Sequence, residues 1–102
     1  MTILGNFIAG QPQASHSGRT AEVFDPASGE VTRQVALSSA DETRDAIRVA
    51  DEAFPGWAKM SPLKRSRILF KFKALVEEHA DEIARLISSE HGKVFSDAKG
   101  EL

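Results

Sequence analysis

Apolar residues recur at helical spacing over most of the chain after residue 39. Between residues 40 and 57 they fall on one side of a helix drawn at about 100° per residue, with charged residues on the other side. Ser39 followed three positions later by Glu42 forms a capping box, which predicts a helix that begins at Ala40. The proline-glycine pair at 55–56 should end or kink this helix, although the tryptophan beyond it keeps the apolar phase and would fit a continuing last turn.

A second helical region covers residues 61–91. Ser61 before Pro62 offers an N-cap and a proline at the first helical position, an arrangement that favours a helix start. We expect a break near residues 79–81, which gives two helices, although one long helix is nearly as consistent with the pattern. A single apolar phase continues through both halves, over Ile68, Leu69, Phe72, Leu75, Val76, Ile83, Leu86 and Ile87.

The last residues of the chain carry a helix stop followed by a helix start. Gly92 with Lys93 is typical of a C-cap, with the cation near the negative end of the helix dipole. Ser96-Asp97 then begins another helical pattern, which Leu102 cuts short. A natural domain seldom ends within the first turns of a helix, so we expect this chain to be part of a longer one.

The first third of the chain carries the pattern of short strands. A β-prone run at 7–9 precedes a polar connection over 11–18, and the runs at 20–24 and 31–37 are the next strand candidates. Residues 25–29 combine an aspartate, a proline and a glycine, which is the chemistry of a turn, so the two later runs should form an antiparallel hairpin. The sequence therefore predicts an α+β chain with short antiparallel strands, three α-helices and the start of a fourth.

Composition limits the chemistry that these 102 residues can perform. The hydrophobic fraction of 41% and the charged fraction of 27% are near globular averages, and a net charge of -2 does not indicate a polyionic partner. Zero cysteines exclude a disulfide, a Cys-ligated metal and a Cys nucleophile within the chain. The first ten residues lack Lys and Arg, and no apolar run approaches the roughly 20 residues of a membrane span. We therefore expect a cytoplasmic protein without a signal peptide, a presequence or a membrane partner.

Three histidines are the first candidates for a metal site or for acid-base chemistry. His79 and Glu82 have the i, i+3 spacing that places two ligands on one helix face, but a site needs three or four. His79 also falls within the apolar stripe, which favours a hydrogen-bonded histidine in the core or at a helix junction. His16 in a polar loop and His91 before the C-cap suit surface or capping roles.

No phosphate-binding loop or carboxylate pair stands out as a catalytic site. Gly92-Lys93 resembles the end of a P-loop, but the leading glycine is replaced by Ile87 and the hydroxyl position by Val94. The seven glycines include no G-x-G pair. The adjacent carboxylates read as solvated helix faces, and they are Asp51/Glu52, Glu77/Glu78 and Asp81/Glu82. We therefore predict no catalytic, cofactor-binding or metal-binding residue in the chain.

A basic segment over residues 59–73 offers the strongest alternative reading. Its cations scatter around the helix, which favours a solvated surface over a nucleic-acid site, and they are Lys59, Lys64, Arg65, Arg67, Lys71 and Lys73. Phe70 lies away from the main apolar stripe, whereas Phe72 lies on it. This helix should therefore contact something on a second side, either a missing domain or a partner subunit.

Four short stretches, in this order and spacing, give the chain a family resemblance. They are Phe-Asp-Pro-Ala-Ser-Gly-Glu at 24–30, Ala-Phe-Pro-Gly-Trp-Ala at 53–58, the block at 65–75 and Glu-His-Gly-Lys at 90–93. Together they resemble the N-terminal segment of the NAD(P)-dependent aldehyde dehydrogenases. The stretches at 69–73 and 97–101 most resemble the CoA-acylating methylmalonate-semialdehyde dehydrogenases, although residues 94–96 depart from the commonest small-residue continuation.

The resemblance implies the role of the chain in a larger enzyme. A full-length member would be a homo-oligomer that oxidises an aldehyde with NAD through a thiohemiacetal on a cysteine, and this subgroup then transfers the acyl group to CoA. Residues 1–102 would be the incomplete N-terminal part of its α/β coenzyme-binding domain. The family's cysteine, oxyanion asparagine and nucleotide-binding strands lie downstream, so no catalytic residue is carried over to this chain.

The leading hypothesis is thus an N-terminal fragment of such an oxidoreductase, inactive alone, which binds no cofactor itself. Its partner would be the downstream part of the same enzyme or a homologous subunit. One alternative is a free-standing helical module that docks on a dehydrogenase subunit through the Phe70 side. A lesser alternative is a weak nucleic-acid binder that uses residues 59–73, although we expect no nucleic-acid partner.

Overall fold

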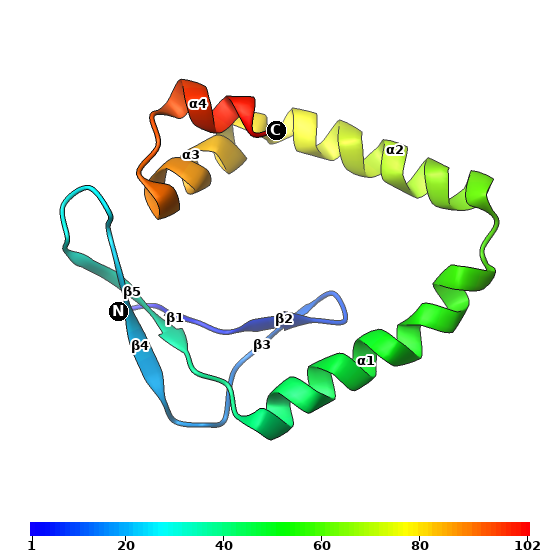
Figure 1. Ribbon diagram of the computed structural model, residues 1–102, viewed down its shortest axis with the longest axis horizontal. Coiled ribbons are helices and arrows are strands. Elements are labelled where there is room, and N and C mark those ends of the chain that lie inside the picture. The colour runs from blue at the N-terminus through cyan, green and yellow to red at the C-terminus, as the bar shows by residue number, and fades with distance from the viewer. The chain divides into compact units, whose positions relative to one another are not determined.

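The structure is a computed structural model that describes all 102 residues. Its chain divides into two compact units, Met1–Phe24 with Val31–Lys59, and Asp25–Glu30 with Met60–Leu102. Figure 1 shows the order of the elements, with strands in the blue and cyan part of the chain and helices from green to red. The predicted α+β class, with strands followed by helices, is confirmed.

A three-stranded sheet has the order β1-β5-β4. β4 (Thr20–Phe24) and β5 (Val31–Ala36) pair antiparallel, which confirms the predicted hairpin. The Asp25 carboxylate holds the turn between them by accepting hydrogen bonds from the N–H groups of Ala27 at 2.7 Å and Ser28 at 3.3 Å. β5 ends one residue earlier than predicted, and the short β1 (Ile3–Leu4) adds to its other edge in parallel.

A second, two-stranded sheet corrects the reading of the N-terminal region. β2 (Asn6–Ile8) pairs antiparallel with β3 (Gln11–Gln13), so part of the predicted polar connection is a strand. Ala9 and Gly10 have positive φ angles of 53° and 75°, as the tight two-residue turn of a hairpin requires. The sequence gave little sign of β3 because glutamine and proline are poor strand formers, and a proline is tolerated where a strand forms a sheet edge.

Helix α1 (Ala40–Lys59) begins at the predicted capping box. The Glu42 N–H donates to the Ser39 hydroxyl at 3.1 Å, and the Ser39 N–H donates to the Glu42 carboxylate at 2.7 Å. The sequence predicts that the proline-glycine pair ends or kinks the helix, with Trp57 fitting a continuing last turn. The helix does not end there, because α1 continues past Pro55 for a further turn that includes Trp57. A proline removes one intrahelical hydrogen bond without preventing the next turn, and the apolar phase kept by Trp57 indicated this outcome.

The second helical region forms two helices, as expected. α2 (Pro62–Glu78) begins at Ser61, whose hydroxyl accepts a hydrogen bond from the Lys64 N–H at 3.3 Å, and α3 (Ala80–His91) follows directly. His79 separates them with φ -101° and ψ 16°, outside helical values. None of the helices has the length and apolar composition needed to cross a membrane.

The short helix α4 (Phe95–Gly100) packs against α3. Ala84 of α3 and Ala98 of α4 are fully buried, which lets the two backbones approach closely. The Arg85 and Lys99 cations both lie 5.7 Å from the centre of the Phe95 ring, and the Lys99 ammonium pairs with Asp81 at 2.9 Å. α4 begins one residue before the predicted Ser96, because Val94 takes the extended N-cap conformation.

Large apolar side chains remain uncovered along the whole chain. Ala84 and Ala98 are the two buried hydrophobic residues, and no large side chain is fully buried. A domain of this length normally buries well over half of the surface of its unfolded chain. The exposed side chains on α1 to α3 include Ile47, Phe54, Trp57, Leu63, Ile68, Leu69, Phe70, Phe72, Leu75 and Leu86.

Candidate functional site

A polar cluster joins the loop after β3 to the start of α1. The Glu42 carboxylate accepts hydrogen bonds from the backbone N–H groups of Ser39 and His16, each at 2.7 Å, and from the Ser15 hydroxyl at 3.0 Å. The Ser39 N–H and then the His16 N–H lower the pKa of Glu42 from 4.5 to about 2. We call these four residues the Glu42 cluster. Its carboxylate stays ionised and engaged at neutral pH, which suits a structural brace and not proton transfer.

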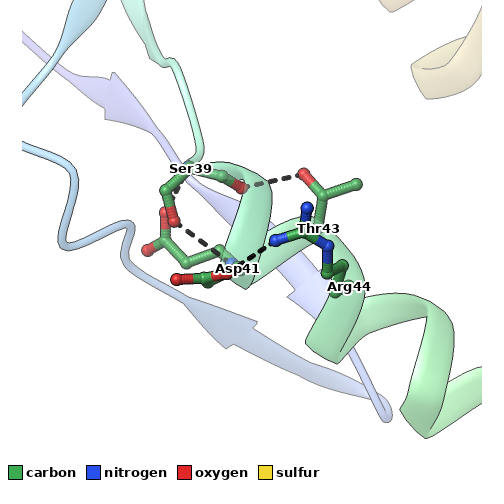
Figure 2. Close-up of polar contacts among 5 residues, drawn as sticks. Ser39, Asp41, Thr43 and Arg44 are labelled. Atoms are coloured by element: carbon green, nitrogen blue, oxygen red, sulfur yellow. Dashed lines mark hydrogen bonds and ion pairs between the residues drawn. The ribbon is translucent and has the colours of Figure 1, made fainter.

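The same helix start carries further local contacts. The Thr43 hydroxyl donates to the Ser39 carbonyl oxygen at 3.0 Å, and the Arg44 guanidinium pairs with Asp41 at 2.8 Å (Figure 2). Both side chains of that ion pair are exposed, so it adds little stability. These contacts complete a helix terminus and leave no donor set directed at a ligand.

An open depression of about 470 Å³ adjoins the Glu42 cluster. Its charged lining consists of Glu42, Asp45 and Arg48. The Arg48 guanidinium already pairs with Glu52 at 2.8 Å and with Asp45 at 3.6 Å. Because each charged group of the lining has a partner within the chain, we assign no ligand to this depression.

His79 and Glu82 lie in contact, as their spacing predicted. The His79 Nδ1 atom lies 3.1 Å from a Glu82 carboxylate oxygen, and the pair is exposed at the junction of α2 and α3. The prediction of a helix-junction histidine is confirmed, because His79 ends one helix and begins the next. The prediction of a core histidine is wrong, because the His79 side chain is 53% exposed. No group of three or more metal-ligating side chains occurs in the chain.

The remaining candidates lie at separate places. His16 is exposed and enters the Glu42 cluster through its backbone N–H, and His91 is the last residue of α3. Gly92 caps that helix with φ 83° and donates its N–H to the Ser88 carbonyl oxygen at 2.8 Å. Lys93 pairs with Glu101. The stretches at 90–93 and 97–101 therefore form the end of α3 and part of the short helix α4 that follows it.

Each adjacent carboxylate pair has at least one member in an exposed ion pair. Glu52 pairs with Arg48 at 2.8 Å, and Glu77 pairs with Lys73. The hydrogen bond from Lys99 lowers the pKa of Asp81 below its ordinary value. Each ion pair joins groups on one helix or on neighbouring helices, so the reading of these carboxylates as solvated helix surface is confirmed. That the chain contains no catalytic or cofactor-binding residue stays a prediction.

An apolar groove crosses the junction of α2 and α3. It has a volume of about 400 Å³ and is lined mainly by Phe72, Leu75, Val76, Ile83 and Leu86. These residues belong to the single apolar phase read from the sequence. The groove is therefore the exposed stripe of an amphipathic helix pair that lacks its cover. It is the strongest candidate for a functional surface in the chain.

Comparison with known proteins identifies the family. The model of the aldehyde dehydrogenase family matches residues 13–102. The chain therefore belongs to the aldehyde dehydrogenase family, and the predicted resemblance is confirmed.

Within that family the chain is similar to semialdehyde dehydrogenases. It is 50% identical over 99 residues to malonate-semialdehyde dehydrogenase 3 of Geobacillus kaustophilus, which covers 97% of this chain and 20% of that protein. A methylmalonate-semialdehyde dehydrogenase structure from Oceanimonas doudoroffii matches with a TM-score of 0.92 at 48% identity, over 99% of this chain and 20% of that one. A Sinorhizobium meliloti protein assigned to the same activity, solved with NAD, matches with a TM-score of 0.92 at 42% identity, over 99% and 21% of the two chains.

The extent of these matches bears on what the chain can do. It spans about a fifth of the length of the curated relatives that it matches. The predicted closeness to the methylmalonate-semialdehyde dehydrogenases is confirmed, and the match is to the N-terminal part of such enzymes.

Proposed function

We propose that this chain is the N-terminal structural layer of an NAD-dependent, CoA-acylating semialdehyde dehydrogenase. Residues 1–102 would form the incomplete N-terminal part of its coenzyme-binding domain. The observation that carries the proposal is the match of nearly the whole chain to a fifth of malonate-semialdehyde dehydrogenase 3. The uncovered apolar groove across α2 and α3 supports it, because such a surface needs a large apolar cover.

In the complete enzyme, an aldehyde would be oxidised to an acyl thioester and the acyl group would pass to CoA. NAD would accept the hydride in that reaction. The nucleophile would be a cysteine thiol, and this chain has no cysteine. The chain would contribute by packing, with Phe72, Leu75 and Leu86 covering apolar parts of the coenzyme-binding domain. It would be inactive and unable to bind NAD alone.

Calorimetry with NAD tests the inactivity of the purified 102-residue chain. We expect no saturable heat at physiological NAD concentration, with a full-length semialdehyde dehydrogenase as the positive control. Saturable NAD binding by the chain alone would contradict the proposal that these 102 residues do not bind NAD by themselves. Sequencing the DNA after codon 102 is a second test, since a reading frame that encodes a glycine-bearing βαβ unit and a later cysteine would support the proposal.

A second candidate function is a free-standing interaction module that docks on a dehydrogenase subunit. The observation that favours it is Phe70, which is 71% exposed. A hydrophobic dye and a thermal melt distinguish the two functions. Strong dye fluorescence and non-cooperative melting are expected of an uncovered layer. A monomer that melts cooperatively without binding the dye would favour the module.

The nucleic-acid alternative rests on the basic segment at 59–73. Lys73 is already paired with Glu77 of the same helix, which reduces the charge available to a phosphate backbone. We expect no mobility shift with duplex DNA or RNA at low salt. A salt-dependent shift would revive this reading. For the complete enzyme we propose a cytoplasmic homo-oligomer, as the family resemblance implies.

A further inference from the structure

Helix α2 has a second apolar face, separate from the main stripe. At about 100° per residue, Leu63, Phe70 and Ala74 lie within about 40° of one another and roughly opposite Phe72. We call these three residues the second face. All three are exposed, Leu63 to 61% and Phe70 to 71%. A cover over the main stripe would leave this face open, because the two faces point in opposite directions.

The charges of α2 oppose its own helix dipole. The helix has no acidic residue in its first turn and no basic residue in its last turn. Its first half instead carries cations, and its last two residues are Glu77 and Glu78. Arg67 and Lys71 also repeat one sign at i, i+4 spacing, which destabilises an isolated helix. Helix stability therefore does not account for this arrangement, and opposite charges from another molecule would.

Two of these charged side chains lie beside the second face without a partner in the chain. Arg67 and Glu78 form no ion pair or hydrogen bond, in contrast to Lys73 and Glu77, which pair with each other. Both lie on the same flank of the face, within about 20° of each other around the helix axis. Residues 67 and 78 lie about three turns apart along the helix, one toward each end.

We propose that two copies of this chain pair through the second face, with their α2 helices antiparallel. In the register that sets Phe70 on the partner's Ala74, two-fold symmetry also sets Ala74 under the partner's Phe70. The same register brings Arg67 level with the partner's Glu78 to within about 1.5 Å along the axis, on the same flank. Each pair of copies thus forms two equivalent Arg–Glu ion pairs around an apolar centre.

The charges beside the second face match a second copy of this chain better than they match a nucleic acid. A nucleic acid would meet the cations but would also meet Glu77 and Glu78 with like charge. An antiparallel copy supplies acidic residues to the basic half and basic residues to the acidic half at the same time. One helix pair buries less surface than a standard interface, so the dimer should be weak and concentration-dependent. The proposal does not rest on the proposed function, since the main stripe faces the other way.

Charge reversal and its rescue test the pairing. Sedimentation velocity of the 102-residue chain over a concentration series should give a monomer-dimer equilibrium that added salt weakens. Arg67→Glu and Glu78→Arg should each weaken the dimer about tenfold, because each places like charges across the interface twice. The double variant R67E/E78R restores both ion pairs with reversed sign and should return the dissociation constant to within about threefold of the parent's value.

Helix content separates loss of pairing from loss of folding. Both charge reversals should stabilise helix α2 by itself. Arg67→Glu creates an i, i+4 pair with Lys71, and Glu78→Arg places a cation at the helix C-terminus. Circular dichroism should therefore show unchanged or higher helicity in the single variants. Phe70→Ser should also weaken the dimer, whereas the matched variant Phe72→Ser on the main stripe should not.

Four results would overturn the proposal. The first is a parent chain that stays monomeric at every concentration. The second is a double variant no better than the weaker single variant. The third is a dimer lost in Phe72→Ser but kept in Phe70→Ser, which would assign self-association to the main stripe. Duplex DNA that binds the parent but neither Arg67→Glu nor the double variant would assign the basic half to nucleic acid instead.

Discussion

The start of α1 and the whole of α2 differ in how many of their polar and apolar groups find partners within this chain. At the start of α1, the Glu42 carboxylate accepts three hydrogen bonds from the loop after β3 and from the helix N-terminus. In contrast, α2 carries charges that oppose its own helix dipole, and it exposes apolar residues on two sides. The polar groups at the start of α1 are satisfied within this chain, whereas the apolar residues of α2 stay uncovered in it.

This difference distinguishes local folding from assembly. Hydrogen bonds and caps can form within a short stretch, because their partners lie close in sequence or in a neighbouring loop. Apolar faces require a second layer, and a chain with two buried hydrophobic residues does not supply it. The α3–α4 pair lies between these cases, since it buries two alanines but leaves Leu86 exposed.

The largest effect is expected where the chain does bury apolar atoms. Ala84→Leu would force three extra carbons into the contact between α3 and α4, where Ala84 is fully buried. Overpacking of this kind costs about 1–3 kcal/mol, so α4 should detach. Amide hydrogen exchange at Ala98 and Lys99 measures the detachment.

Ala50→Leu on α1 is the matched control, because Ala50 is exposed and the added carbons meet solvent. It should leave exchange in α4 unchanged. Unaltered protection in Ala84→Leu would show that the α3–α4 contact does not determine where α4 lies, and this region would then belong with α2 as one that needs an outside cover.

The Glu42 cluster provides the next largest effect. Glu42→Gln removes the charge and turns one acceptor oxygen into a donor that faces an N–H group, so exchange at the His16 and Ser39 amides should accelerate. Asp45→Asn, in an exposed ion pair with Arg48, is the control and should change little.

Protonation of Glu42 at acid pH should have the same effect as Glu42→Gln. The pKa of Glu42 is lowered from 4.5 to about 2, so the folded state holds fewer protons than the unfolded state between these values. The stabilisation is therefore fully present above pH 4.5 and is lost as the pH falls toward 2. Protection at the Ser39 amide that does not change from pH 5 to pH 2 would contradict the role given to this carboxylate.

Elements with local signals could be predicted from the sequence. The capping box at Ser39, the proline at the start of α2 and Gly92 at the end of α3 each act through neighbours within four residues. β1 and β3 were missed because their pairing depends on main-chain groups brought from elsewhere in the chain, which leave no mark on residues such as Gln11 and Gln13.

The same limit applies to the candidate site. The capping box identified Glu42, but not the Ser15 hydroxyl and the His16 N–H that also reach its carboxylate, because the loop that carries them has no periodic pattern. The apolar stripe of α2 and α3 was read correctly from its period. That it stays uncovered could not be read from the pattern, since an amphipathic helix looks the same with and without its partner layer.

The smallest effect on the structure of the isolated chain is expected in the exposed apolar groove across α2 and α3. Phe72→Ser removes a ring that is 63% exposed, so the helix content of the isolated chain should not change measurably. Hydrophobic-dye fluorescence should nevertheless fall, because Phe72 lines the groove across α2 and α3. Circular dichroism and a dye titration of the same samples measure both quantities. A marked loss of helix content, with unchanged dye binding, would mean that α2 already buries this ring, and the contrast between the start of α1 and α2 would be lost.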